Sequence, residues 1–501
     1  MTGTVILVGA GPGDPGLLTV KGRAALLSAQ VVVYDRLVSP AILALIPAGA
    51  EAIDVGKQAS RHPVPQEQIN QILLDKALEG KRVVRLKGGD PFLFGRGGEE
   101  LELLVRHGVP FEEVPGITSA IAVPAYGGIP VTHRDFTSSL HIVTGHARAG
   151  KALDIDFDAL VRTGGTLVFL MGVSSLPDIC AGLVGAGMDP ATPAAIVEQG
   201  TTPGQRRFNA TVAALPETAR ANGVESPAVS IVGPVCALAE SFDWFDALPL
   251  KGKTIVVTRP RARAGTLSDR LRALGAEVVE YPCIETVPLV PCPEMERALA
   301  RLADYEWLAL TSPAGVEALF GELERQGRDA RALGGVKLAA IGPGTNRELG
   351  KHGLRADYVP QVYDAAHLGT GLAALAVGRV LILRAREGSP ALTQALDRAG
   401  VGYNDVPVYD THYENPKSRE LRAMVEEGAV NLVTFTSAST VKGFVSSVGE
   451  GADLSRITGA CIGAQTAAEA EQYGIHTIVA QAATMEALVE TIIKRGEQEW
   501  N

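Results

Sequence analysis

The feature that most constrains the fold is an alternation that runs through all 501 residues of the chain. Short β-branched runs such as TVILVGA, VVVYD and RVVRLKGGD are separated by stretches rich in alanine and leucine. The same alternation continues in the second half with KTIVVTRP, RVLILRA and NLVTFTS. Strands that alternate with helices are typical of α/β proteins with mainly parallel sheets. We therefore expect an α/β chain, and its length exceeds that of one ordinary domain.

One stretch interrupts this alternation. In ESFDWFDALPLKGKTIVVTRP, aromatic, acidic and proline residues precede a new strand that a lysine introduces. Domain boundaries fall where such compositional shifts occur. We place a boundary near Leu248 to Lys251, which predicts one domain over residues 1–248 and another over residues 251–501.

The second of these domains repeats itself. LRALGAEVVEYPCIET resembles LDRAGVGYNDVPVYDT, and TSPAGVEALF resembles TSASTVKGFV, both at an offset of 125 residues. AAIGPGTNRELGKHG resembles ACIGAQTAAEAEQYG with a slip of a few residues. Two copies of one α/β unit predict two similar lobes that face each other across a cleft. A duplication that only builds a scaffold is the alternative.

Composition excludes several classes of protein. The net charge is −10, with no block of basic residues, so nucleic acid is not an expected partner. No apolar run approaches the roughly 20 residues of a membrane helix, and no export signal is visible. The five cysteines are scattered and never spaced as C-x-x-C, so we expect neither a disulfide framework nor a metal site. A reducing cytoplasm fits this pattern best.

The opening stretch VILVGAGPGDPGLLT satisfies the spacing of a dinucleotide-binding glycine loop. Such a loop opens a helix whose first N–H groups face a pyrophosphate. Pro12 and Pro15 lack those donors and interrupt that register. The nucleotide interpretation is therefore the weaker one.

Residues 1–245 carry a set of motifs in a characteristic order: GAGPGDPGLLT, YDRLV, RLKGGDPFLFGRGGEE and PGITSA. These motifs fall at the ends of expected strands, where ligands of open α/β sheets bind. This part of the chain resembles the tetrapyrrole methylases, and in particular the uroporphyrinogen-III C-methyltransferases. The resemblance implies an S-adenosylmethionine site between two α/β lobes.

The resemblance also assigns residues by motif. The implied cofactor-binding residues are Pro12, Gly88, Gly89, Asp90, Leu93, Thr118, Ser119, Met171 and Gly200. It implies Asp35 in YDRLVS as a proton acceptor and Lys57 in VGKQ as a proton donor. The residues themselves leave other roles open, because Asp35 can cap the following turn and Lys57 can bind a substrate carboxylate.

The implied tetrapyrrole substrate carries many carboxylates, which arginine and histidine side chains can receive. The basic residues available near the motifs are Arg61, His62, Arg96, His133, Arg134, His146 and Arg148.

From about Lys251 onward the chain resembles the uroporphyrinogen-III synthases, through VVTRP, TSPAGV, AIGPGT, VPVYDT, FTSAST and CIGAQTA. The resemblance implies a two-lobed, flavodoxin-like domain whose first lobe combines about 251–286 with 411–501, while the second spans about 287–410. It implies that Tyr409, in VYDT, matches a tyrosine important for catalysis in that family. Ser312, Ser437 and Thr466 are expected to hold the substrate. That Tyr409 is only a core aromatic remains open.

Together the resemblances imply a bifunctional enzyme. It would cyclise hydroxymethylbilane to uroporphyrinogen III and then transfer two methyl groups from S-adenosylmethionine, giving precorrin-2 for sirohaem or cobalamin and S-adenosylhomocysteine as by-product. Its expected partners are these small tetrapyrroles and a second copy of the chain, bound through the methylase part, with no nucleic acid and no membrane. Two alternatives remain open: methylation of a later corrin precursor or of ribosomal RNA, and a second half that acts as a sensor of the periplasmic-binding type.

Overall fold

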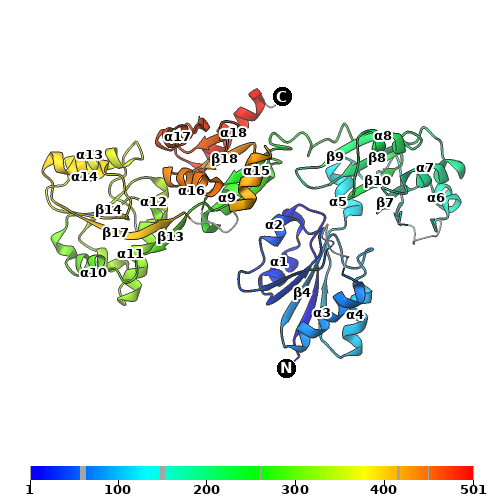
Figure 1. The fold of residues 1–501 in the computed structure, drawn as a ribbon, viewed down its shortest axis with the longest axis horizontal. Helices are drawn as coiled ribbons and strands as arrows, with labels where there is room; N and C mark the ends of the chain where they lie inside the picture. The colour runs from blue at the N-terminus through cyan, green and yellow to red at the C-terminus, as the bar shows by residue number, and fades with distance from the viewer. Residues whose placement is uncertain are drawn as a thin grey trace. The chain divides into compact units, whose positions relative to one another are not determined.

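The computed structural model describes residues 2–56, 64–146, 153–259, 261–413, 418–449 and 451–499. The chain separates into two compact units (Figure 1). The first unit comprises Met1–Gly252 with Leu274–Glu277, and the second comprises Lys253–Ala273 with Val278–Asn501. Each unit contains two five-stranded sheets.

The first sheet of the first unit forms what we call the leading lobe. It contains β1 (Thr4–Gly9), β2 (Val31–Tyr34), β3 (Glu51–Asp54), β4 (Arg82–Lys87) and β5 (Phe111–Val114), in the order β3-β2-β4-β1-β5. All four pairings are parallel. The carboxyl ends of these strands therefore lie at one edge, where the motif-bearing loops begin.

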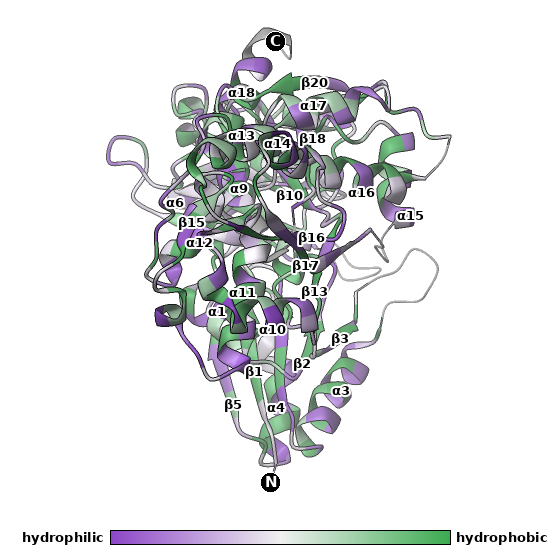
Figure 2. Cartoon of the chain, turned by 90° about the vertical axis from the view of Figure 1, so that its left-hand side faces the viewer, coloured by the Kyte–Doolittle hydropathy of each residue, from purple (hydrophilic) through white to green (hydrophobic). Residues whose placement is uncertain are grey.

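Helices cover both faces of this sheet, and β1 shows how. Val5 and Leu7 pack in one apolar cluster with Leu73 of α3 (Gln66–Leu78) and with Leu104 of α4 (Gly97–Arg106). The alternate residues of β1 pack instead with α1 (Val20–Leu27) and α2 (Pro40–Leu43). Successive strand residues point to opposite faces, so both faces of a doubly covered sheet are apolar. In Figure 2, α3 carries both green and purple residues, as a helix with one buried side requires.

The second sheet of the first unit forms the following lobe. Its strands are β6 (Leu140–Thr144), β7 (Thr166–Leu170), β8 (Pro193–Glu198), β9 (Arg206–Thr211) and β10 (Ala228–Val232), in the order β6-β7-β10-β8-β9. Its helices are α5 (Ser119–Tyr126), α6 (Phe157–Thr163), α7 (Leu176–Gly185) and α8 (Leu215–Ala221). Only the β6–β7 pairing is parallel, and the other three are antiparallel. The expectation of mainly parallel sheets is therefore wrong for this lobe, because alternation of strands and helices does not specify strand direction.

One lobe of the second unit, which we call the split lobe, is built from two distant chain segments. Its sheet has the order β12-β11-β18-β19-β20. The strands are β11 (Thr254–Val257), β12 (Glu277–Glu280), β18 (Leu432–Phe435), β19 (Thr458–Cys461) and β20 (His476–Val479), and the helices are α9 (Arg261–Ala273), α15 (Ser418–Glu426), α16 (Ala438–Val448), α17 (Ala464–Glu471) and α18 (Met485–Glu499). Figure 1 shows its green segment, with α9, beside the orange and red segments.

The other lobe, the inserted lobe, uses the intervening chain. Its sheet has the order β13-β17-β16-β14-β15. The strands are β13 (Glu285–Pro288), β14 (Trp307–Leu310), β15 (Lys337–Ala340), β16 (Val380–Ala385) and β17 (Tyr403–His412), and the helices are α10 (Pro293–Ala300), α11 (Pro313–Arg325), α12 (Pro343–Lys351), α13 (Ala365–Leu375) and α14 (Ala391–Ala399). β13 is antiparallel to β17, whereas β14–β15, β14–β16 and β16–β17 are parallel.

The two lobes of the second unit repeat one arrangement. The sequence β11–α9–β12 corresponds to β16–α14–β17, and β18–α16–β19 corresponds to β14–α11–β15. The predicted α/β fold with two lobes in each part, internally duplicated in the second, is confirmed.

Candidate functional site

The loops after β1 and β4 are joined directly at the edge of the leading lobe. The N–H of Gly11 donates to the carbonyl of Gly89 at 3.1 Å, and the N–H of Gly89 donates to the carbonyl of Gly11 at 2.8 Å. The N–H of Ala10 also donates to the carbonyl of Lys87, at 2.7 Å. The loop that contains Pro12 and the loop that contains Gly88, Gly89 and Asp90 are thus parts of one structure.

Glycines allow a third loop to approach these two. A Cβ on Gly116 would lie 2.1 Å from the carbonyl oxygen of Gly89, and one on Gly9 would lie 2.4 Å from the Cα of Gly116. A Cβ on Gly88 would lie 2.6 Å from the Cβ of Leu37 in the loop after β2. No real side chain occupies such space, so close backbone contact explains the glycines in these motifs.

Asp90 holds two of these loops together. Its Oδ1 accepts hydrogen bonds from the N–H groups of Phe92 and Leu93 at 2.9 and 3.0 Å. Its Oδ2 accepts one from the N–H of Gly116 at 2.9 Å. Both oxygens thus bind the protein backbone, and the implied binding of the cofactor by Asp90 stays a prediction.

The following lobe contributes its own loops to this site. The N–H of Asp14 donates to Oγ1 of Thr201 at 3.3 Å, and the hydroxyl of Tyr126 donates to Oδ2 of Asp14 at 2.6 Å. Leu93 packs against the core cluster of the following lobe, which includes Val123. Contacts therefore connect the predicted cofactor loops of both lobes.

Backbone strain is concentrated in the same loops. Among the described residues, the non-glycine residues with positive φ are Phe94, Arg96, Met171, Gln199 and Thr201. Met171 follows β7 with φ +56° and a half-exposed side chain, and Gln199 and Thr201 flank Gly200. Such conformations persist only where the surroundings enforce them, and they are enriched at functional sites. The strain supports the expectation that these loops bind a ligand.

The other predicted cofactor residues line the start of α5. Thr118 caps this helix, and its Oγ1 accepts a hydrogen bond from the N–H of Ala120 at 3.3 Å. An added Cβ at Gly89 would have only the N of Ser119 within 4 Å, at 3.9 Å. Gly200 packs against Val123 so closely that an added Cβ would lie 2.4 Å from its side chain.

Asp35 lies beside a buried cluster of charges. Its Oδ1 accepts a hydrogen bond from the N–H of Leu37 at 3.1 Å, so it does cap the following turn. Its Oδ2 lies 3.5 Å from an NH2 group of Arg85. Lys57, the expected proton donor, lies outside the described residues.

The buried cluster consists of Arg85, Lys87 and Glu100. Oε1 of Glu100 accepts hydrogen bonds from Nε of Arg85 at 3.1 Å and from Nζ of Lys87 at 2.7 Å. Burial, followed by the positive charge of Arg85, lowers the pKa of Lys87 from its ordinary value. A buried carboxylate between two cations keeps those charges tolerable inside the sheet.

The basic residues expected to bind substrate carboxylates lie in different surroundings. Arg96 is paired with Glu99, and His133 lies against Phe136 at a ring distance of 5.0 Å. Arg134 and His146 are exposed. Arg61, His62 and Arg148 lie outside the described residues.

In the second unit, Tyr409 and Ser312 are hydrogen-bonded to each other. Tyr409 lies on β17 and is 8% exposed, and its hydroxyl donates to Oγ of Ser312 at 2.9 Å. Ser312 is the N-cap of α11, and its Oγ also accepts a hydrogen bond from the N–H of Gly315 at 3.0 Å. Tyr409 is thus a core aromatic whose hydroxyl reaches the N-terminus of a helix at the carboxyl edge of the sheet.

The split lobe holds Ser437 and Thr466 in comparable places. Ser437 is the N-cap of α16, where its Oγ accepts a hydrogen bond from the N–H of Thr440 at 3.3 Å. Thr466 lies in the first turn of α17 and is 4% exposed, as is its counterpart Thr345 in α12 at 2%. Helix capping accounts for the position of Ser437, and packing accounts for those of Thr466 and Thr345. Substrate binding stays a prediction for Ser437 and Thr466.

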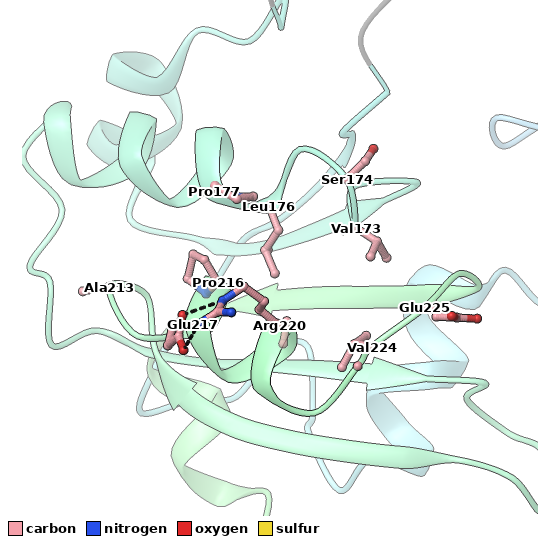
Figure 3. A pocket seen from close by; sticks show the side chains of 12 residues that line it. Val173, Ser174, Leu176, Pro177, Ala213, Pro216, Glu217, Arg220, Val224 and Glu225 are labelled. Atoms are coloured by element: carbon pink, nitrogen blue, oxygen red, sulfur yellow. Dashed lines mark hydrogen bonds and ion pairs between the residues drawn. The ribbon is translucent and has the colours of Figure 1, made fainter.

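A separate hollow of about 630 Å³ lies beside α7 and α8 (Figure 3). Its lining includes Val173, Pro216 and the ion pair between Glu217 and Arg220, whose side chains are both exposed. None of the predicted site residues lines it.

Sequence reasoning missed several residues that build the site. Asp14, Tyr126 and Thr201 connect the two lobes of the first unit, Gln205 binds the N–H of Thr201, and Glu100 pairs with both Arg85 and Lys87. One signal was available, because Arg85 and Lys87 are two residues apart and alternate with the apolar Val84 and Leu86 in the same strand. They must therefore share a face and need a buried anionic partner.

Three further observations concern the described residues. None of their helices combines the length and the apolar character needed to cross a membrane. All five cysteines are buried and unpaired, and burial raises the pKa of Cys180 to about 11. Among the same residues, no three histidine, cysteine or acidic side chains gather as a metal site would require.

The comparisons with known proteins match both parts of the chain to families. A family model described as tetrapyrrole (corrin/porphyrin) methylases matches residues 4–216, and one described as uroporphyrinogen-III synthase HemD matches residues 265–490. The porphyrin biosynthesis protein HemD of Ruminiclostridium josui is 48% identical over 497 residues, which are 99% of this chain and 98% of that protein.

Two further relatives resemble parts of the chain. The uroporphyrinogen-III C-methyltransferase of Bacillus subtilis is 40% identical over 352 residues, which are 70% of this chain and 72% of that protein. The crystal structure of uroporphyrin-III C-methyltransferase from Thermus thermophilus, complexed with S-adenosylhomocysteine, is 43% identical, with a TM-score of 0.40. It covers 47% of this chain and 100% of that one.

The chain therefore belongs to the family of proteins that join a tetrapyrrole methylase to a uroporphyrinogen-III synthase. The match to the methylases lies in the first unit, and the match to the synthases lies in the second unit apart from residues 274–277.

Proposed function

We propose that the chain catalyses two consecutive steps of tetrapyrrole biosynthesis. The second unit cyclises hydroxymethylbilane to uroporphyrinogen III, with inversion of the last ring and loss of water. The first unit transfers two methyl groups from two molecules of S-adenosylmethionine to uroporphyrinogen III, giving precorrin-2 and two molecules of S-adenosylhomocysteine. Membership of the joined family supports both activities.

The observation that carries the methylase assignment is the joining of the cofactor motifs by hydrogen bonds. Gly11 pairs with Gly89, Asp90 binds the N–H of Gly116, and Asp14 binds Thr201. Glycine-lined loops and the half-exposed thioether of Met171 fit a ligand that is recognised through main-chain groups and an apolar surface.

When bound, S-adenosylmethionine supplies a methyl group already activated by its sulfonium. The work left to the protein is to hold that group in line with a pyrrole carbon and to exclude water. The tightly packed glycine loops provide the fixed positions. We propose that Asp35, which the N–H of Leu37 and Arg85 hold in one orientation, accepts the proton that the methylated ring must lose.

The synthase reaction needs less acid–base chemistry, because the hydroxymethyl group of the bilane loses its hydroxyl readily while its carbon is kept for ring closure. The enzyme must fold the bilane so that the correct carbon is attacked. The hydroxyls of Tyr409 and Ser312 lie within one hydrogen bond of each other at a strand end. When it gives up its hydrogen bond to Ser312, the Tyr409 hydroxyl can donate to the leaving hydroxide or stabilise charge on the ring system.

One experiment tests both assignments. The full chain is incubated with hydroxymethylbilane, with and without S-adenosylmethionine, and the products are analysed by mass and absorbance. We expect type III uroporphyrinogen without the methyl donor and a dimethylated product with it. If the type I isomer is the sole cyclic product, the second half is better explained as a sensor. If supplied uroporphyrinogen III is not methylated, the first half acts on another methyl acceptor.

The remaining proposals concern cellular context. We propose that the chain works in the cytoplasm, because five unpaired cysteines suit a reducing compartment. We also propose a homodimer formed through the first unit, which light scattering of the purified chain would test. The product serves sirohaem or cobalamin synthesis.

A further inference from the structure

The last segment of the first unit packs onto a loop of the predicted cofactor site. This closing segment, Trp244–Lys251, follows the last strand of the following lobe. The loop, residues 199–205, connects β8 to β9 and contains Gly200. Gln199 and Thr201 in this loop have φ values of +47° and +68°, so its conformation must be enforced by its surroundings.

Lys251 supplies one of the enforcing contacts. Its Nζ donates to the carbonyls of Pro203 and Gln205, both at 2.9 Å, and lies 3.3 Å from Oδ1 of Asp246. It also lies 5.2 Å from the ring centre of Phe245. The side chain is 13% exposed, so it is fixed by these partners rather than solvated.

Gln205 carries the contact onward to the strained residue. Its Oε1 accepts a hydrogen bond from the N–H of Thr201 at 2.9 Å, and its Nε2 donates to Oδ1 of Asp246 at 3.2 Å and to the carbonyl of Tyr126 at 3.1 Å. Gln205 is 5% exposed and Thr201 is 2% exposed. A buried network of this kind, with its members satisfied, rigidifies the backbone that it joins.

The network ends on the glycine-rich loop of the leading lobe. Oγ1 of Thr201 accepts a hydrogen bond from the N–H of Asp14, and Oδ2 of Asp14 accepts one from the hydroxyl of Tyr126. The ring of Tyr126 packs against Trp244 and Phe245 at centroid distances of 4.9 and 4.8 Å. Two routes therefore connect the closing segment to the loop that contains Pro12.

We propose that the closing segment is part of the cofactor site, and that Lys251 and Gln205 are positioning residues that hold loop 199–205 against the glycine-rich loop for binding of the sulfonium nucleoside. This inference rests on the proposed methylase function. It assigns a role in methylation to a lysine that the sequence places at the boundary between the two parts of the chain.

The test measures the affinity of the full chain for S-adenosylhomocysteine by calorimetry, together with kcat and KM for S-adenosylmethionine. Lys251→Met keeps the apolar stem and removes the donor. We expect it to raise both the dissociation constant and KM about ten-fold, with kcat little changed, and we expect Lys251→Arg to restore most of the affinity. A merely structural loss would lower the amount of active enzyme and leave KM unchanged.

The matched control is Lys337→Met in the second unit. Lys337 also binds a carboxylate, Oε1 of Glu306 at 3.1 Å, and also lies over an aromatic ring, Trp307, at 5.3 Å. Its loss should leave the affinity for S-adenosylhomocysteine at the wild-type value.

Folding is followed by the thermal transition and by the synthase reaction of the same sample. If Lys251→Met does not fold, Gln205→Leu is measured in its place, with the same expectation. A folded variant that binds S-adenosylhomocysteine as tightly as the wild type would overturn the inference. A wild-type chain that binds no S-adenosylhomocysteine would instead overturn the proposed function, so the two failures are distinguishable.

Discussion

The two units solve the problem of ligand binding differently. In the first unit the predicted site is made of glycine-packed loops, and it contains every described non-glycine residue with positive φ. In the second unit the predicted side chains are hydroxyls at strand ends and helix N-termini, with ordinary backbone angles. The shape of the first site is fixed by packed, strained backbone before a ligand binds. The second site consists of side chains on helices and strands with ordinary backbone angles.

This difference follows from the chemistry proposed for each unit. Methyl transfer requires one carbon to be aligned with one activated methyl group, and small displacements are costly. Cyclisation requires a flexible bilane to be held in one fold while a good leaving group departs. A strained, rigid loop system suits the first task, and hydroxyls on helix N-termini suit the second.

The largest expected effect comes from filling a glycine contact of the first unit. In Gly116→Ala the new Cβ would lie 2.1 Å from the carbonyl oxygen of Gly89, so the loops must separate. We expect methylation of supplied uroporphyrinogen III to fall at least about 100-fold, while type III isomer formation is kept.

The control for this variant is a glycine of the second unit. Gly344 is the second residue of α12, and an added Cβ would meet nothing within 4 Å. Gly344→Ala should leave both reactions near wild-type rates. Normal methylation by Gly116→Ala would show that the loops of the first unit are not pre-shaped in the sense argued above.

The next largest effect concerns Tyr409, which distinguishes the two lobes of the second unit. Its counterpart in the repeat is Ile284, because each follows a matched proline, Pro407 and Pro282, by two residues. Tyr409→Phe should lower type III isomer formation about ten-fold, which is about 1.4 kcal/mol of transition-state stabilisation. Methylation should be unchanged.

Tyr281→Phe provides the comparison in the split lobe. Tyr281 is also buried, at 3% exposed, but belongs to a different cluster of the core. We expect wild-type isomer ratios from this variant. An equal loss in both variants, or none in Tyr409→Phe, would return Tyr409 to a packing role.

A smaller effect is expected from two serines that cap helices, and it distinguishes a capping role from a role in the reaction. Ser312→Ala and Ser437→Ala each remove the N-cap of an equivalent helix, and each should lower the free energy of unfolding by about 1 kcal/mol. Only Ser312 also accepts the hydroxyl of Tyr409, so Ser312→Ala should shift the products toward the type I isomer more than Ser437→Ala does. Equal isomer ratios from the two variants would contradict this asymmetry.

The smallest effect is a pH dependence of stability. The pKa of Lys87 lies below its ordinary value of 10.5, so between the two values the unfolded chain binds more protons than the folded chain. Stability contributed by this site therefore rises with pH through that window. Lys87→Met should abolish the rise, as measured by hydrogen exchange of the β4 amides.

Lys76 on α3 should give the opposite dependence of stability on pH. A hydrogen bond to Glu51 raises the pKa of Lys76, so its contribution is present below pH 10.5 and is lost as the pH rises further. Lys76→Met should remove that loss. The same pH trend in both variants would contradict the assignment of Lys87 to a buried site.

The sequence predicted the parts of the structure that local patterns determine. The α/β fold, the duplication and the loops at the carboxyl ends of β1, β2, β4 and β5 are all confirmed. The glycine motifs were informative because close backbone contact allows no other residue there. Strand direction in the following lobe was not predictable, since parallel and antiparallel strands there have the same apolar pattern.

The sequence could not reveal contacts between distant residues. No pattern in the sequence predicts the contact of Glu100 with Lys87, of Tyr126 with Asp14, or of Lys251 with the loop at Gln205. These pairs depend on which helix or segment packs over which strand end. The roles of the remaining predicted site residues, Asp35 and Tyr409 among them, stay predictions until the variants are measured.

The central claim is that one chain carries two independent sites on two independently folding units, and separate expression of the units tests it most directly. The fragments are residues 1–252 and 253–501, because an end at residue 248 would remove Lys251 and the buried Leu250. Leu274–Glu277, which belongs to the first unit, stays in the second fragment, because it joins α9 to β12 in the split lobe. We predict that the first fragment methylates supplied uroporphyrinogen III and that the second converts hydroxymethylbilane to the type III isomer, each at close to the rate of the intact chain. If neither fragment retains its reaction while the intact chain performs both, the claim is wrong.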